Sequence, residues 1–221
     1  PRNKAAILGS RLDSIRMIYE LLRQLPARIR PECVVNASSV SIYSSCALPV
    51  DEFSVVRPDT AFFQSQVWHA VEGRIAELRV PGVRTLIARL GLVVGADLLM
   101  QRMLRLSRCY LGSILGDGRQ RISWISRHDL ARALTYLLTN TEQQGIFNIV
   151  TPRPMTAEQF GAGMARSVDR PALLRIPAGL LRVLLGELAN NFLTSADAMP
   201  ARLQMAGFHW ELPDFTQAMQ A

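Results

Sequence analysis

Lysine is almost absent from this chain, and its scarcity bears on the choice of partners. The 221 residues include 25 lysines and arginines against 18 acidic residues, yet Lys4 is the one lysine, and the formal net charge is +7. The arginines are scattered singly, whereas nucleic-acid-binding proteins group their basic residues on one face or along one helix. The charge therefore indicates a solvated surface with a compositional bias, and we expect no nucleic-acid partner.

Long hydrophobic runs and paired cysteines are also missing. No apolar stretch reaches the roughly 18 residues that a membrane-spanning helix needs, and the first residues lack a signal-peptide core. Cys33, Cys46 and Cys109 are odd in number and form no CxxC pair, which is typical of thiols in a reducing compartment. We therefore expect a soluble cytoplasmic protein with no membrane partner.

Helices and buried strands alternate along the chain. Apolar periodicity predicts helices over 4–25, 61–78, 98–108, 130–138, 156–167 and 178–188, and buried strands over 33–37, 83–94 and 145–150. We also expect a glycine-containing loop over 112–119, an extended linker over 170–177, a short helix opening at Ser195 and an end to the fold over 207–210. This pattern predicts an α/β fold with a Rossmann-like, doubly wound parallel sheet and a small, mostly helical C-terminal region. Such sheets bind ligands at the carboxyl ends of their strands.

Three segments carry motifs of one superfamily. They are Asn36-Ala37-Ser38-Ser39-Val40-Ser41-Ile42-Tyr43, the run Arg84–Gly95, and Gly116-Asp117-Gly118-Arg119-Gln120 followed by Trp124-Ile125 and His128-Asp129. Together they resemble the extended short-chain dehydrogenases/reductases. The C-terminal residues resemble the domain of unknown function of the NAD-dependent epimerase-like subgroup: Arg170-Pro171-Ala172, Pro177, Leu184-Leu185-Gly186-Glu187, Pro200, Leu203 and Ala206-Gly207-Phe208.

The resemblance implies a biochemical class. Residues 1–167 would form part of an NAD(P)-binding Rossmann-like epimerase domain, and residues 168–221 the helical region of that subgroup. The cofactor would be NAD or NADP, and the substrate a small molecule such as a nucleotide sugar. A homo-oligomer is a further expectation.

The chain nevertheless lacks two parts of the family pattern. Members begin with a glycine-rich GxxGxxG turn that receives the dinucleotide pyrophosphate, and no such turn occurs here. By comparison with the family, roughly 70–80 residues of the first βαβ unit are absent. The family's catalytic tyrosine and lysine are also replaced: with Glu72 as the anchor of the alignment, their positions hold Gln64 and Trp68. Neither side chain relays a proton, so we expect impaired catalysis or none. From the missing turn we expect weak dinucleotide binding or none.

The candidate site residues cluster near the two strand ends. Ser38 and Ser39 are the candidate catalytic residues, since a hydroxyl just past a strand could polarise a substrate oxygen, although strand-end turns use serine equally often. The candidate cofactor-binding residues are Ala37, Ser38, Tyr43, Arg89, Leu90 and Gly91. For Tyr43 the alternative is packing, and for Arg89–Gly91 it is a core strand with a glycine that eases its twist.

The remaining polar candidates favour structural roles. We expect Trp124 to pack a loop and Asp129 to cap a helix. His128 has no second histidine or cysteine at metal-ligand spacing, and His69 and His209 have no visible partner, so no metal site is expected.

Two functions stay open from the sequence: an impaired NAD(P)-dependent epimerase or reductase, and a binding or regulatory module without catalysis.

Overall fold

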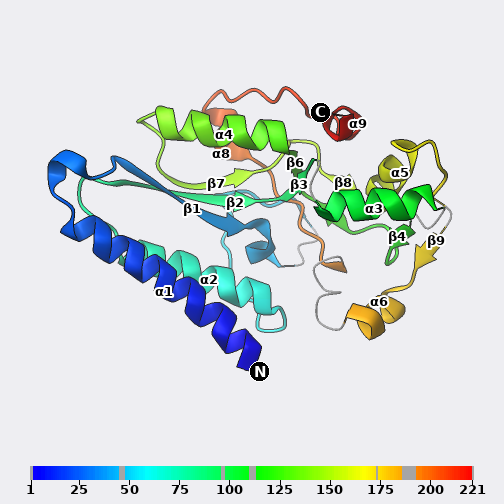
Figure 1. Cartoon of the computed structure of the whole chain (residues 1–221), viewed down its shortest axis with the longest axis horizontal. Coiled ribbons are helices and arrows are strands. Elements are labelled where there is room, and N and C mark those ends of the chain that lie inside the picture. Colours follow the sequence, from blue (N-terminus) through cyan, green and yellow to red (C-terminus); the bar gives the residue numbers. More distant parts are fainter. Residues whose placement is uncertain are drawn as a thin grey trace.

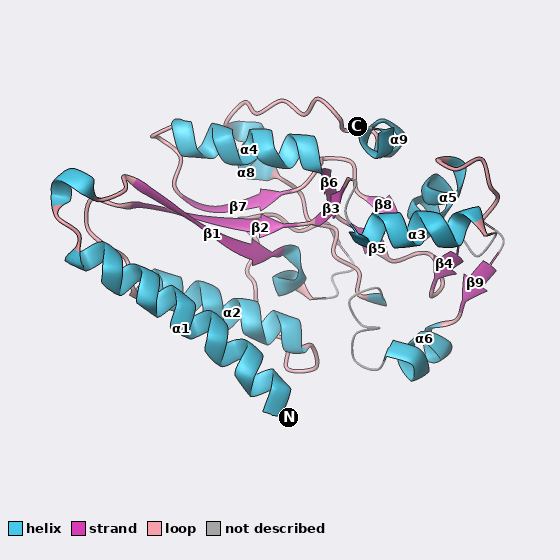
Figure 2. Cartoon of the chain, in the orientation of Figure 1, coloured by secondary structure: helices cyan, strands magenta, loops and turns pink. Residues whose placement is uncertain are grey.

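The computed structural model describes residues 2–44, 48–95, 98–109, 113–172, 174–185 and 193–220. Cys46, Gly112 and the Gly186-Glu187 pair of the C-terminal motif lie outside the described residues, as does the end of the apolar helix expected over 178–188. Figures 1 and 2 show a central sheet with helices on both of its sides.

The described residues form both helices and strands. The helices are α1 (Arg2–Gln24), α2 (Phe63–Glu77), α3 (Leu98–Arg108), α4 (Arg127–Thr139), α5 (Ala157–Arg166), α6 (Ala178–Leu185), α8 (Ala201–Met205) and α9 (Phe215–Gln220), with 3₁₀ turns η1 (Ala27–Ile29) and η2 (Val40–Tyr43). The strands are β1 (Cys33–Ser39), β2 (Arg84–Leu90), β3 (Leu92–Val94), β4 (Ser113–Leu115), β5 (Arg121–Ile122), β6 (Trp124–Ser126), β7 (Gly145–Ile149), β8 (Met155–Thr156) and β9 (Leu174–Ile176).

The central sheet contains three parallel strands in the order β1-β2-β7. Ser39 lies opposite Leu90, and Leu90 lies opposite Ile149, so the three strands end side by side. This arrangement confirms the predicted α/β class with a Rossmann-like parallel sheet.

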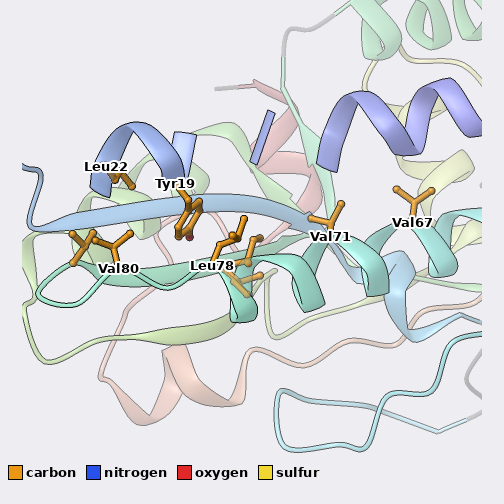
Figure 3. Close-up of a cluster of buried hydrophobic side chains, with 9 residues drawn as sticks. Tyr19, Leu22, Val67, Val71, Leu78 and Val80 are labelled. Carbon is orange, nitrogen blue, oxygen red and sulfur yellow. The ribbon is translucent and has the colours of Figure 1, made fainter. Parts of the chain in front are cut away.

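Successive side chains of the strands pack into two separate hydrophobic cores, one on each face of the sheet. Ile87 packs with Tyr19, Val71 and Ile75 beneath α1 and α2, a cluster shown in Figure 3. Its neighbour Leu86 points to the opposite face, against α4 and α8. Successive residues of a strand face opposite sides, which explains why the buried strands read as continuous apolar runs. Burial of each large apolar side chain contributes about 1.5–3 kcal/mol.

The single strand expected over 83–94 is wrong, because the chain breaks at Gly91 into β2 and β3. The Gly91 N–H still donates to Ile149 O (3.3 Å), and the next N–H, from Leu92, donates to Ser123 O (2.9 Å). A Cβ atom at position 91 would lie 2.7 Å from both Ser123 O and Val150 Cγ1. Glycine is therefore required where the chain leaves β7 and begins to pair with β6.

Two expected loops also contain strands. The 112–119 loop holds β4, and the 170–177 linker holds β9, and these two pair in parallel. Each is three residues long, too short for the periodicity of a strand to be visible in the sequence.

The C-terminal predictions need two corrections. Ser195 opens no helix: its Oγ accepts from Arg121 N (2.9 Å), and the short helix α8 begins at Ala201, after Pro200. The fold also continues past Gly207–Trp210, since Phe215 of α9 packs edge-on against Trp124 and Phe160.

The β7 edge of the sheet is closed by side chains. The Glu52 carboxylate accepts from Asn148 N (2.8 Å), and Arg202 donates to Ile146 O and Gln144 O (2.8 Å each). These contacts take the place of a neighbouring strand and satisfy the exposed ladder groups.

Within the described residues, no helix is both long enough and apolar enough to cross a membrane. The division at residues 167 and 168 stays a prediction.

Candidate functional site

The carboxyl ends of β1, β2 and β7 meet at one edge of the sheet, where parallel α/β proteins bind ligands. Each predicted site residue except Tyr43 lies on β1 or β2 or directly after β2, and Tyr43 ends the η2 turn that follows β1. The contacts at this edge therefore decide which of the two serines, the tyrosine and the end of β2 could bind a ligand.

The Ser38 hydroxyl is hydrogen-bonded to another side chain of the protein. Its side chain is buried against α2, and its Oγ donates to Glu72 Oε1 at 2.6 Å. Its proton is therefore committed to a carboxylate of the protein, which leaves little of this hydroxyl for a substrate.

The Arg89 guanidinium joins the same carboxylate. Its Nη2 lies 2.7 Å from Glu72 Oε2, and its Nε lies 2.9 Å from Glu72 Oε1, with both side chains almost fully buried. Burial acts to lower the pKa of Arg89, but the hydrogen bonds and charge of Glu72 outweigh it, so the pKa is raised and Arg89 stays charged. A buried ion pair of this kind is stable only while both charges are present, because removal of one leaves the other buried without a partner.

Tyr43 extends this network to β7. Its hydroxyl accepts from Arg89 Nη1 (2.8 Å), and the Tyr43 hydroxyl and Asn148 Oδ1 are hydrogen-bonded at 2.9 Å. Burial raises the pKa of Tyr43, although Arg89 opposes that rise. Of the two roles considered for Tyr43, the contacts favour packing within the fold.

Ser39 is arranged differently. It is half-buried, and its Oγ caps η2 by accepting from Ser41 N (3.2 Å) and Ser41 Oγ (2.8 Å). The hydroxyl thus uses its acceptor capacity locally and keeps its proton for donation. Ala37, two residues earlier on the same side of β1, is exposed.

The end of β2 offers little surface to a ligand. Arg89 is inside the network, and Leu90 packs partly against the core beneath α4. Gly91 does permit a close approach, but the atoms that approach it belong to Ser123 and Val150.

Gln64 and Trp68 lie one turn apart on α2. Gln64 lies three and seven residues before Val67 and Val71, which are buried, but it belongs to the first turns of the helix and is exposed. Trp68 is half-buried, and the guanidinium of Arg11 stacks over its ring at 4.8 Å. An amide and an indole therefore stand at the two positions that the sequence analysis predicted to correspond to the tyrosine and lysine.

The other polar candidates have structural contacts. Trp124 is buried, and its Nε1 donates to Arg153 O (3.0 Å). Asp129 does not cap α4, because the N-cap is Ser126; the fully buried Asp129 carboxylate instead accepts from Glu211 N and Leu212 N (2.9 Å each). It thereby fastens the C-terminal segment to α4.

The histidines are dispersed. His128 Nε2 lies 2.6 Å from Glu211 Oε2 at the surface. Among the described residues, no group of three or more His, Cys, Asp or Glu side chains could hold a metal ion.

Three network residues were not among the candidates from the sequence: Glu72, Asn148 and Glu52. Asn148 could have been noticed as a lone amide inside the apolar run Ile146–Val150. Glu72 follows directly after the buried Val71 on α2. A carboxylate on the buried side of a helix is unusual, and this feature could have identified Glu72.

Two family models match the chain. The NAD dependent epimerase/dehydratase family matches residues 10–150, and a domain of unknown function, DUF1731, matches residues 176–221.

Curated relatives and a solved structure agree with this result. The chain is 29% identical over 219 residues to epimerase family protein YfhF of Bacillus subtilis, covering 99% of this chain and 71% of YfhF. It is 30% identical over 219 residues to epimerase family protein SSP1921 of Staphylococcus saprophyticus, covering 98% of this chain and 72% of that protein. The crystal structure of human epimerase family protein SDR39U1 with NADPH superposes with a TM-score of 0.91 at 26% identity, covering 100% of this chain and 74% of the human one.

A more distant structure agrees in fold. A nucleoside-diphosphate sugar epimerase from Corynebacterium glutamicum has a TM-score of 0.77 at 22% identity, over 99% of this chain and 42% of that one. The fold, the motifs and the family model lead to one conclusion: this chain belongs to the NAD dependent epimerase/dehydratase family.

Proposed function

We propose that this chain is an NAD(P)-type epimerase or reductase scaffold that has kept part of the ligand-binding edge and lost the proton relay. The observation that carries the proposal is the pair of side chains on the first turns of α2. Gln64 and Trp68 occupy the aligned tyrosine and lysine positions, and neither can exchange a proton near neutral pH.

The residues at the edge fit part of a nicotinamide dinucleotide. Ser39 keeps a hydroxyl proton for a ribose or carbonyl oxygen, and the exposed Ala37 lets a ligand approach β1. The cofactor, when bound, would supply hydride transfer, while Ser39 would orient the oxygen that reacts. The 221 residues contain no glycine-rich turn for the pyrophosphate, so we expect weak dinucleotide binding.

A nucleotide-sugar-like substrate is the favoured ligand class. The support for this substrate class is that a structural neighbour is a nucleoside-diphosphate sugar epimerase. The support for the cofactor class is that SDR39U1 was crystallised with NADPH.

The second candidate function is a binding or regulatory module without catalysis. The contact between Ser38 and Glu72 favours it, because it withdraws the second candidate hydroxyl from the chemistry. The two candidates differ in whether the edge still binds a cofactor.

Calorimetric titration with NADPH and NADH, followed by absorbance assays with a panel of nucleotide sugars, separates the candidates. The proposal predicts weak binding that Ser39→Ala reduces further, with no oxidation or reduction of the cofactor. The double variant Gln64→Tyr/Trp68→Lys is the matched test of the relay, and we expect it to raise any turnover by about 10²–10⁴-fold.

Three results are decisive. Turnover by the unaltered chain would contradict the loss of the relay. Binding that Ser39→Ala leaves unchanged would contradict the assigned ligand edge. No binding by either the chain or the double variant would favour the non-catalytic module.

A further inference from the structure

We propose that Ser44 contacts the sugar ring of a nucleotide-sugar-like ligand and helps the strand-end edge to recognise that ring. Ser44 follows Tyr43 directly and is the C-cap of η2, the turn that continues from the carboxyl end of β1. The inference rests on the nucleotide-sugar class of the proposed function, but it needs neither the cofactor nor the proton relay. It starts from two features of Ser44 that the fold does not require.

The first feature is a backbone conformation that favours glycine. Ser44 has a φ of 56° and a ψ of −147°. Among the described residues, Asp169 is the one other non-glycine residue with a positive φ, and it lies just after α5, where its N–H donates to Arg166 O (3.0 Å). A positive φ is ordinary at such a helix end. The ψ of Ser44, in contrast, is far from the left-handed helical value of about 47°, so its backbone is strained, and strain of this kind clusters at ligand sites.

The second feature is a buried hydroxyl without a partner. Ser44 is 7% exposed, and its Oγ makes no hydrogen bond within the part of the chain that the structure describes. Alanine or glycine at this position would avoid the cost of burying an unpaired polar group. Because Oγ is covered by atoms of this chain, a ligand reaches it only after rotation about χ1, which moves the hydroxyl to another staggered position.

The η2 turn carries a hydroxyl at each of its ends. Ser39 is its N-cap and Ser44 its C-cap, and Ser41 connects them. Ser41 N donates to Ser39 Oγ (3.2 Å), and Ser44 N donates to Ser41 O (3.2 Å). Since one turn of four residues holds both hydroxyls, a single small ligand can contact the two.

The side chains of this turn are neutral. Residues 39–44 read Ser-Val-Ser-Ile-Tyr-Ser and contain no charge, and the nearby Arg89 guanidinium is already bonded to Glu72 and Tyr43. Phosphate groups are typically bound by cationic side chains, whereas a serine hydroxyl both donates and accepts, as does each alcohol group of a sugar. The turn therefore fits the sugar ring of the ligand rather than its diphosphate.

Titration of the full chain with UDP-glucose and with UDP, followed by the backbone amide signals in NMR spectra, tests the inference. UDP lacks the sugar ring, so the ratio of the two dissociation constants isolates the contribution of that ring. We expect UDP-glucose to shift the amide signals of Ser39 and Ser44 and to bind more tightly than UDP. Ser44→Ala should weaken UDP-glucose binding by about two- to tenfold, the effect of one lost hydrogen bond, and leave UDP binding unchanged.

Two further variants separate binding from stability. Ser44→Gly also lacks the hydroxyl but adopts the positive φ without strain, so it should bind UDP-glucose as weakly as Ser44→Ala and unfold at a higher urea concentration than that variant. Thr151 is 1% exposed and its Oγ1 is likewise unpaired among the described residues, but it follows β7. Thr151→Val is therefore the matched control, and it should leave the affinity for UDP-glucose unchanged.

Three results would overturn the inference. The first is UDP-glucose that does not bind, or binds no more tightly than UDP. The second is an affinity for UDP-glucose that both Ser44 variants leave unchanged. The third is an equal loss for UDP-glucose and UDP in Ser44→Ala, which would assign the contact to the nucleotide. Titration with NADPH and the turnover assays decide the proposed function separately, so either conclusion can fail without the other.

Discussion

Ser38 and Ser39 are neighbours in the sequence, yet they belong to two different regions of the strand-end edge. Ser38 lies in a buried region with Glu72, Arg89, Tyr43 and Asn148, where each polar group is engaged by another. Ser39 lies on the opposite face of β1, in an accessible region with the exposed Ala37. The side chains of the buried region therefore stabilise the fold, and those of the accessible region remain available to a ligand.

The largest expected effect comes from breaking the buried ion pair. Glu72→Ala leaves the Arg89 charge without its partner, and we expect the free energy of unfolding to fall by about 3–5 kcal/mol, measured by urea denaturation. Glu77→Ala on the same helix is the matched control, because its pair with Arg74 is exposed and contributes about 0–1 kcal/mol. Equal losses in the two variants would show that burial adds nothing to the contribution of the Glu72–Arg89 pair.

A smaller loss is expected at Tyr43. Tyr43→Phe removes the hydroxyl that bridges Arg89 and Asn148 and leaves both short of a partner. We expect a decrease of about 1–3 kcal/mol in the free energy of unfolding. Unchanged stability would show that the hydroxyl is not part of the network.

The exposed start of α2 should respond little in stability. Gln64→Ala alters an exposed side chain, and we expect its unfolding free energy to stay within about 0.5 kcal/mol of the unaltered chain. A loss as large as that of Tyr43→Phe would contradict the exposed position of Gln64.

The smallest effect is a pH dependence at Glu52, at the outer end of the buried region. Burial raises the pKa of Glu52 above its ordinary value of 4.5, although hydrogen bonds from Asn148 N and Arg202 N oppose the rise. The folded state therefore holds the proton more tightly than the unfolded state, so this contribution to stability is present below 4.5 and is lost as the pH rises through the raised pKa. Thermal unfolding across that range should show the decline in the unaltered chain and a weaker one in Glu52→Gln.

The sheet could be predicted from the sequence because its strands are buried on both faces. The apolar runs before Ser38 and before Gly91 carry that signal without tertiary information. The break at Gly91 could not be predicted, since it depends on contact with Ser123, which is 32 residues away in the chain. The strands β4 and β9 stayed hidden because each exists only by pairing with the other.

The position of the candidate site could be predicted from the sequence, but the roles of its residues could not. The motif located Ser38, Ser39, Tyr43 and Arg89 at one edge, and alternation placed the two serines on opposite faces. Which face α2 would bury, and that Glu72 would meet both Ser38 and Arg89 there, depended on packing between distant segments.

A double-mutant cycle on Ser38→Ala and Glu72→Gln tests the central claim most directly, with unfolding free energies measured at one protein concentration. If Ser38 belongs to the buried region, the two changes should be coupled by about 0.5–3 kcal/mol, whereas Ser39→Ala and Glu72→Gln should be additive within about 0.5 kcal/mol. Additivity for Ser38 would contradict the account, because it would free the Ser38 hydroxyl from the fold and return it to the ligand edge.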